Sequence, residues 1–272
     1  MKIKILIFSL LVLFGVTSLR AQYHQIGIFG GGSNFAGDVG PNVPDIPRGY
    51  AMGAFYRLNF NRHWAMRGQF NYGKIKADDQ YSNVSFRKLR DLSFQSTIWE
   101  ASLMMEFNFF EYEPGTKLNH TPFLVGGWGL FWFEPKTEYQ GSLIALQPLG
   151  TEGQGTSANP DPKYAQASSF MIFGLGYRFA VSRDFSIGIE ATFRSTNTDY
   201  LDDVSGTFAD PDIILEENGE AAAALSNRFR NPDEWVGRLR GDPSGDDWYV
   251  FTGFTLEYKI DSFYEKCAKF FE

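Results

Sequence analysis

Cysteine and histidine are scarce in this sequence, and an excess of positive charge is missing. The 272 residues include one cysteine, Cys267, and three histidines, His24, His63 and His120. A single cysteine excludes an internal disulfide framework, and three widely separated histidines argue against a multi-histidine metal centre. Acidic residues outnumber basic residues by 32 to 25, and the pI is near 5.1, which argues against a nucleic-acid-binding face. We therefore expect no metal, no other cofactor and no nucleic-acid partner.

The N-terminal segment has the pattern of a secretion signal. Lysines precede an apolar run from Ile5 to Val16, and Ala21 stands where cleavage would follow. This pattern predicts a signal peptide over residues 1–21 that is removed on export. A retained membrane anchor is the alternative.

Long hydrophobic runs are missing after residue 21. No apolar segment there approaches the ~18 residues that a transmembrane helix requires. Apolar and polar residues instead alternate with a period of two, which is typical of β-strands with two different faces. The alternation predicts eight strands, over residues 23–34, 50–60, 64–73, 97–109, 122–133, 168–180, 185–194 and 248–259.

Three features favour a membrane barrel over a soluble β-sandwich. The apolar face of several predicted strands begins and ends with an aromatic residue, as at Trp99 and Phe109, and such ends match the aromatic girdles of membrane barrels. The opposite face carries small and charged residues that a soluble core would reject. The connections alternate between long and short, as in barrels with long outer loops and short periplasmic turns.

The sequence therefore predicts an all-β fold: an eight-stranded antiparallel up-and-down transmembrane β-barrel of the OmpA-like type, with long extracellular loops, over residues 22–260. The N- and C-termini would both be periplasmic, in an integral outer-membrane protein with outer-membrane lipid around it. Residues 261–272 would form a periplasmic C-terminal tail. The stretch 211–233 is helix-capable and lies inside the last long loop.

The inward face of the predicted strands carries charges of both signs in equal number. The interior of an eight-stranded barrel is just wide enough for side chains to fill, and unpaired charges there would be costly. We therefore predict an ion-pair network that plugs the lumen, the alternative being that some of these groups are solvated at the rims. The residues of this predicted network are Arg57, Arg67, Glu100, Glu106, Arg178, Glu190, Arg194 and Glu257.

Few other residues suggest chemistry. Asp199, Asp202 and Asp203 place three carboxylates within five residues, which fits either a weak calcium site or a hydrogen-bonded loop. No His-x-Ser pair occurs on any predicted strand, and an outer-membrane acyl-chain hydrolase would need such groups close together. We therefore expect no catalytic site.

Several loop motifs carry a family resemblance. They are GGSNFAGD at residues 31–38, FQSTIWE at 94–100, LGTEGQG at 149–155 and TDYLDDVS at 198–205. With these motifs the chain resembles the PorG family of the Bacteroidetes type IX secretion system over about residues 23–260. The motif residues in the two most specific loops are Thr151, Glu152, Gly153, Gln154, Gly155, Asp199, Tyr200, Asp202 and Asp203.

The resemblance implies an accessory barrel without a catalytic activity. Members of that family associate with a periplasmic ring of a PorK-like lipoprotein and a PorN-like protein, and in gliding members the apparatus also serves motility. We expect an anchor for this ring. The alternatives are a passive structural or small porin-like barrel and an outer-membrane lipid-modifying enzyme. Candidate partner contacts lie on the periplasmic turns and the tail, at Glu111, Glu113, Lys117, Arg183, Phe263, Tyr264, Phe270 and Phe271.

Overall fold

The computed structural model describes residues 23–41 and 47–260. The expected signal peptide over residues 1–21 and the expected tail over residues 261–272 lie outside the described residues. The same holds for the four aromatic residues of the tail that are candidate partner contacts.

The described residues form a closed antiparallel barrel of eight strands. Each strand pairs with its neighbours along the chain, and β1 pairs with β9 to close the sheet. The eight-stranded up-and-down prediction is thereby confirmed. The barrel strands are β1 (Tyr23–Ala36), β2 (Gly49–Asn59), β3 (Trp64–Asp78), β4 (Ser93–Asn108), β5 (His120–Tyr139), β7 (Ala167–Ala180), β8 (Phe185–Thr196) and β9 (Trp248–Ile260). A ninth short strand, β6 (Ser142–Ala145), pairs with the end of β5.

Strands β3, β4 and β5 exceed their predicted lengths by three residues or more. The pairing of β3 with β4, and of β4 with β5, continues several residues beyond a row of aromatic side chains, through Lys76, Gln95 and Lys136. These residues are polar on the outward face, so the apolar–polar contrast that marks a strand in the sequence is lost there. Backbone hydrogen bonding does not depend on that contrast, and the ladder continues.

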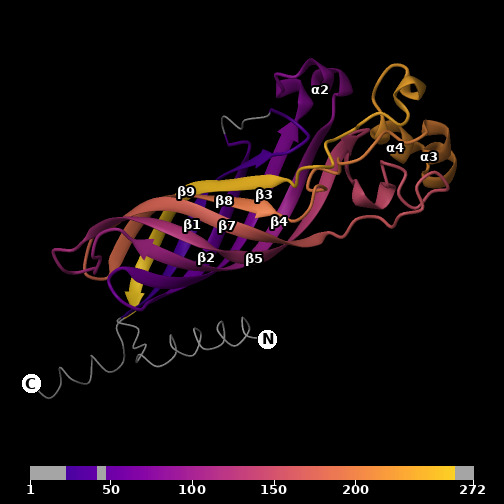
Figure 1. Ribbon diagram of the computed structural model, residues 1–272. Coiled ribbons are helices and arrows are strands. Elements are labelled where there is room, and N and C mark those ends of the chain that lie inside the picture. The colour runs from indigo at the N-terminus through magenta and orange to yellow at the C-terminus, as the bar shows by residue number, and fades with distance from the viewer. Residues whose placement is uncertain (1–22, 42–46, 261–272) are drawn as a thin grey trace, which may run out of the picture.

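The two ends of the barrel are unequal. Residues 60–63, 109–119 and 181–184 form the turns at one end, whereas the connections at the other end span residues 37–48, 79–92, 140–166 and 197–247. The short helices lie in the long connections, as Figure 1 shows for α2, α3 and α4, opposite the end of β9. They are η1 (Asp79–Tyr81), α2 (Ser85–Arg90), η2 (Gln147–Leu149), α3 (Pro211–Asn218), α4 (Glu220–Ser226) and η3 (Pro232–Trp235).

The helical insertion predicted at 211–233 is present as α3 and α4. Asp210 caps α3 by accepting hydrogen bonds from the backbone N–H groups of Asp212 and Ile213, and Pro211 takes the first helical position. Gly219, with φ of 91°, separates the two helices. Among the described residues, no helix combines the length and the apolar composition needed to cross a membrane.

The outward face of the barrel is apolar, and its aromatic residues gather at its two edges. Leu175 and Phe254 expose 58% and 69% of their surfaces, which a water-soluble fold would bury. Tyr72, Trp99 and Trp132 are aligned across β3, β4 and β5 at the edge nearest the long loops. At the other edge the aligned aromatic pairs include Trp64 with Phe107 and Phe185 with Tyr258. This band with two aromatic edges is the surface of a membrane-spanning barrel.

The inward face is only partly the small and charged surface that the sequence suggests. Charged groups fill the half near the short turns. Toward the long loops, aromatic and aliphatic side chains pack against one another, with Phe131 contacting Phe133, Phe170 and Tyr249. The expectation of a small and charged inward face is therefore incomplete, because large apolar side chains fill the space that the charged groups leave.

Candidate functional site

Six buried charges cluster in the half of the lumen nearest the short turns. They are Arg57, Arg67, Arg178, Glu106, Glu190 and Glu257, and each is at most 2% exposed. Glu106 is the centre of the cluster. Its carboxylate lies 2.9 Å from Nε of Arg57 and 3.0 Å from Nε of Arg67, and it also pairs with Arg178. One carboxylate is thus shared by three guanidinium groups.

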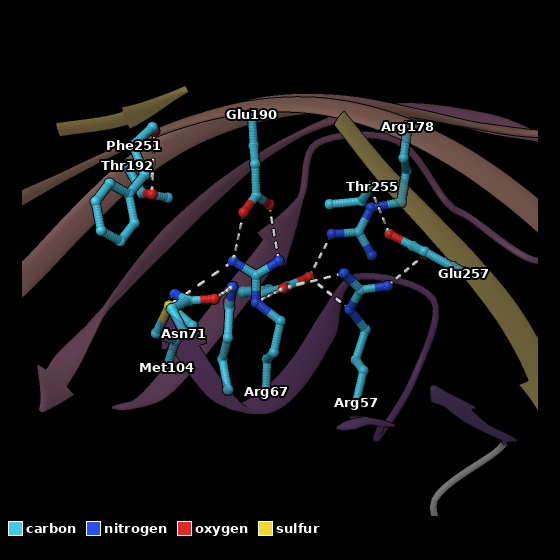
Figure 2. A network of polar contacts seen from close by, with 12 residues as sticks. Arg57, Arg67, Asn71, Met104, Arg178, Glu190, Thr192, Phe251, Thr255 and Glu257 are labelled. Atoms are coloured by element: carbon cyan, nitrogen blue, oxygen red, sulfur yellow. Dashed lines mark hydrogen bonds and ion pairs between the residues drawn. The ribbon is translucent and has the colours of Figure 1, made fainter. Parts of the chain in front are cut away.

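The remaining two carboxylates join strands that are not neighbours in the sheet: Glu190 of β8 meets Arg67 of β3 across the lumen, and Glu257 of β9 meets Arg57 of β2. Figure 2 shows Glu190 and Arg67 meeting from opposite sides, and Nη1 of Arg67 lies 2.8 Å from Oε2 of Glu190. Arg57 pairs likewise with Glu257, and Gln25 accepts from Arg57 and donates to Glu257. These ion pairs connect β2 with β9 and β3 with β8. The cluster therefore ties the two sides of the lumen together.

A second charge pair lies closer to the long loops. Glu100 accepts from Arg194 at 2.8 Å, from the Tyr249 hydroxyl at 2.6 Å and from Nδ2 of Asn71 at 2.6 Å. The guanidinium of Arg194 also stacks 4.2 Å from the centre of the Phe251 ring. All eight residues of the predicted network thus lie inside the barrel, in two groups. The sequence did not reveal the contributions of Asn71 and Tyr249.

The turn between β4 and β5 closes the lumen at the end with the short turns. Tyr112 is fully buried and donates from its hydroxyl to Oγ of Ser186 at 2.6 Å, while the Tyr23 hydroxyl donates to the Tyr112 carbonyl oxygen at 3.3 Å. The same turn also contains Phe109 and Phe110, so aromatic character alone did not single out Tyr112 in the sequence.

The candidate partner contacts on the turns differ in their surroundings. Glu111 and Glu113 both pair with Arg62, at 3.0 and 3.1 Å. A partner that binds either glutamate would therefore compete with an existing ion pair. Lys117 and Arg183 are exposed at the same end of the barrel.

At the opposite end, the two loops that carry the family motifs dock on each other. Glu152 accepts from the backbone N–H groups of Ser205 and Gly206, at 2.9 and 3.0 Å, and pairs with Arg240 at 3.1 Å. Asp203 accepts from the hydroxyl groups of Thr151 and Tyr164. The two motifs, distant in sequence, are halves of one buried polar contact.

Local conformation explains the composition of the first motif. Gly153 and Gly155 have φ of 78° and 80°, a region that glycine adopts without strain, and the side chain of Gln154 accepts from the Glu152 N–H at 3.1 Å. In the second motif, the Tyr200 ring stacks on Tyr164 with 4.6 Å between centroids.

Arg90 joins the other two long loops to this contact. It pairs with Asp79 at 2.8 Å, donates to the Asp38 carbonyl oxygen at 2.8 Å and donates to the carbonyl oxygen of Arg240. All four long loops are therefore interlocked. We call this assembly, residues 37–41, 79–92, 140–166 and 197–247, the cap.

Asp202 and Asp203, two of the three clustered aspartates, are held by hydrogen bonds within the cap. Asp202 accepts from the backbone N–H groups of Val39 and Val204, at 2.9 and 3.0 Å, and Asp203 is bonded as described above. Asp199 is partly buried nearby. Among the described residues, no group of three or more His, Cys, Asp or Glu side chains is arranged to hold a metal ion.

Burial shifts the titration of the cap. It raises the pKa of Asp199 to about 7 and the pKa of Asp203 to about 6, from an ordinary value of 3.8. Burial also raises the pKa of Asp38, Asp202 and Asp247. The folded cap thus retains protons that the opened loops would release.

This shift predicts a pH-dependent cap. Because the folded pKa values exceed the unfolded value, the cap is most stable near the ordinary aspartate pKa and loses stability as the pH rises through about 6 and about 7. Amide hydrogen exchange in the cap, corrected for the intrinsic pH dependence, should show stronger protection at about pH 5.5 than at about pH 8. Asp199→Asn should reduce the difference. Equal or stronger protection at the higher pH would contradict the prediction.

Taken together, the apolar band, the closed sheet and the filled lumen define an eight-stranded transmembrane β-barrel of the outer-membrane type. The chain belongs to the family described as domain of unknown function DUF6089, whose model matches residues 4–212. A comparison with curated proteins found no match.

Solved outer-membrane barrels are similar to this chain at low identity. The N-terminal β-barrel domain of Pseudomonas aeruginosa OprF is 10% identical, with a TM-score of 0.36 and coverage of 88% of this chain and 98% of that chain. Neisserial surface protein A is 9% identical, with a TM-score of 0.42 and coverage of 87% and 97%. Ail, the attachment invasion locus protein of Yersinia pestis, is 11% identical, with a TM-score of 0.42 and coverage of 88% and 99%.

Proposed function

We propose that this protein is a non-catalytic integral outer-membrane barrel that anchors the periplasmic ring of a type IX secretion system. In this proposal the short turns and both termini face the periplasm, and the cap faces the exterior. The partners would be a PorK-like lipoprotein and a PorN-like ring protein, and in gliding organisms the same assembly would serve motility.

The observation that carries the anchoring role is the closed lumen. The buried clusters around Glu106 and Glu100 fill the interior, and Tyr112 closes the end near the short turns. A barrel filled in this way offers a rigid body fixed in the membrane rather than a route for solutes. The identity of the partners rests on the loop motifs that resemble the PorG family, two of which form the central contact of the cap.

The surface expected to bind the ring is the end with the short turns. Lys117 and Arg183 are exposed there. The ion pairs of Arg62 with Glu111 and Glu113 hold two neighbouring turns together. A preformed turn surface lowers the conformational entropy that binding must offset.

Co-purification from outer membranes tests this role. Deleting residues 261–272, or combining Lys117→Glu with Arg183→Glu, should each reduce recovery of the PorK-like and PorN-like proteins severalfold. The control is Lys88→Glu on α2 of the cap, which reverses the charge of one lysine at the other end of the barrel. This variant should leave recovery unchanged.

The outcomes separate the parts of the proposal. Undiminished recovery with the tail deletion and with the double variant would remove both surfaces from the binding site. Loss with Lys88→Glu instead would move the contact to the cap. If the unaltered protein recovers no ring protein, the anchoring role itself is wrong.

A further inference from the structure

The outward face of β3, β4 and β5 carries an ordered series of residues where these strands leave the apolar band. Tyr72, Trp99 and Trp132 form the aromatic row, aligned strand to strand. Four residues further along β3 lies Lys76, which is aligned with Gln95 of β4 and through it with Lys136 of β5. Because side chains alternate between faces, all six point to the outside of the barrel.

The height of the two lysines corresponds to the headgroup layer. Tryptophan and tyrosine concentrate at the membrane–water interface. Four residues of a strand span about 13 Å, or about 10 Å along the membrane normal for a strand tilted by ~40°. Lys76 and Lys136 therefore lie just beyond the hydrocarbon, where the polar groups of the lipids are.

The two lysines border a cavity. It has a volume of about 550 Å³ and is lined by Arg48, Lys76, Lys136, Gln95, Tyr81 and Leu143, among other residues. Lys76 and Lys136 are separated by one intervening strand, which places their backbones about 10 Å apart. The Arg48 guanidinium lies 4.0 Å from the centre of the Tyr81 ring. Three cationic side chains and one amide thus border a space large enough for a headgroup.

Acidic groups share this surface. Asp78 and Glu138 also line the cavity, and Glu134 lies 2.7 Å from Nζ of Lys136. Asp78 accepts from the Gln80 N–H at 2.8 Å and stands further from the aromatic row than Lys76. The pair of Glu134 with Lys136 is half-exposed, so its net energy is small and an anion with more charge can displace it.

We propose that this cavity binds the phosphate group of a lipid headgroup in the leaflet next to the cap, with Lys76 and Lys136 contacting the phosphate. The proposal goes beyond the ring-anchoring role and depends on the orientation proposed above only for the choice of leaflet, the outer one. A lipid held here would link the membrane to β3 and β4, whose connecting loop carries the Arg90 contacts of the cap.

Native mass spectrometry of the full chain in detergent tests the site with defined probes. The probes are lipid A carrying both phosphates and the same lipid after removal of the phosphates. The phosphorylated form should bind, and the double variant Lys76→Gln with Lys136→Gln should weaken binding roughly 25-fold, about fivefold for each lysine near the membrane surface. Glu134→Gln should strengthen binding by at most about fivefold, because it removes a competing anion from Lys136.

Two controls make the result specific. Lys117→Gln, at the opposite end of the barrel, should leave binding unchanged. Millimolar inorganic phosphate should not displace the lipid, because the site is defined by a headgroup held at the membrane surface. Retained heat-modifiable migration on gels would show that each variant is folded.

The proposal would be overturned by equal binding of the dephosphorylated lipid, by full binding to the double lysine variant, or by displacement with inorganic phosphate alone. None of these outcomes bears on ring binding, which is measured at the other end of the barrel. The double lysine variant should still co-purify the ring proteins, so the two proposals can fail separately.

Discussion

Replacing Glu106 with glutamine should destabilise the barrel by about 3–5 kcal/mol, the range measured when one partner of a buried ion pair is removed. Glu106 is shared by Arg57, Arg67 and Arg178, and all four side chains are fully buried. The variant would leave three guanidinium groups facing the carboxylates of Glu190 and Glu257 alone. Urea unfolding in lipid vesicles, followed by tryptophan fluorescence, measures the loss.

Two further variants control this result. Glu111→Gln breaks an exposed ion pair with Arg62 and should change the unfolding free energy by less than about 1 kcal/mol. Adding Arg178→Gln to Glu106→Gln restores equal numbers of buried cations and anions in this cluster, and should recover part of the loss. If Glu106→Gln proves no more harmful than Glu111→Gln, the ion-pair cluster does not hold the barrel together.

Replacing Arg240 with alanine should open the cap while the barrel stays folded. The Arg240 side chain pairs with Glu152, approaches Asp203 to 3.8 Å and donates to the Ser226 carbonyl oxygen at 3.2 Å. Its loss leaves two buried carboxylates without their cation, which costs about 3–5 kcal/mol and would raise the population of open cap at least about a hundredfold. Limited proteolysis within residues 140–166 and 197–247 should quicken accordingly.

The matched control is Arg238→Ala. Arg238 is exposed and stacks 5.0 Å from the centre of the Trp235 ring, so its removal should change the cleavage rate less than about tenfold. Thermal unfolding of the barrel should be the same in both variants, because the clusters around Glu106 and Glu100 lie inside the strands. Unchanged cleavage in Arg240→Ala would show that the cap does not depend on this contact.

The closed lumen and the interlocked cap make similar use of arginine. Glu106 in the barrel and Glu152 in the cap are buried acids whose arginine partners come from other strands or loops. Removing either partner leaves a buried charge, so such pairs penalise wrong arrangements more than they add net stability. We infer that the arginines specify how walls and loops meet, while the apolar band supplies the membrane affinity.

Much of the barrel could be predicted from local rules. A strand places successive side chains on opposite faces, so the alternation around Tyr56 or Leu103 shows which residues meet lipid. The inward position of all eight network charges follows from the same period. The unequal loop lengths show that the long connections gather at one end of the barrel. The two loop motifs were noticed as distinctive, although nothing local indicated that Glu152 and Asp203 would share Arg240.

The sequence by itself determined the number of barrel strands, the two faces of each of these strands, and the inward position of the eight network charges. Only the tertiary structure decided that three arginines share Glu106, that Tyr112 turns inward, and that Arg90 and Arg240 join loops about 150 residues apart. The physical reason is that backbone geometry within one strand sets the side of the sheet to which each side chain points. Contacts across the lumen depend instead on the stagger of the closed sheet, and contacts in the cap depend on four loops packing at once.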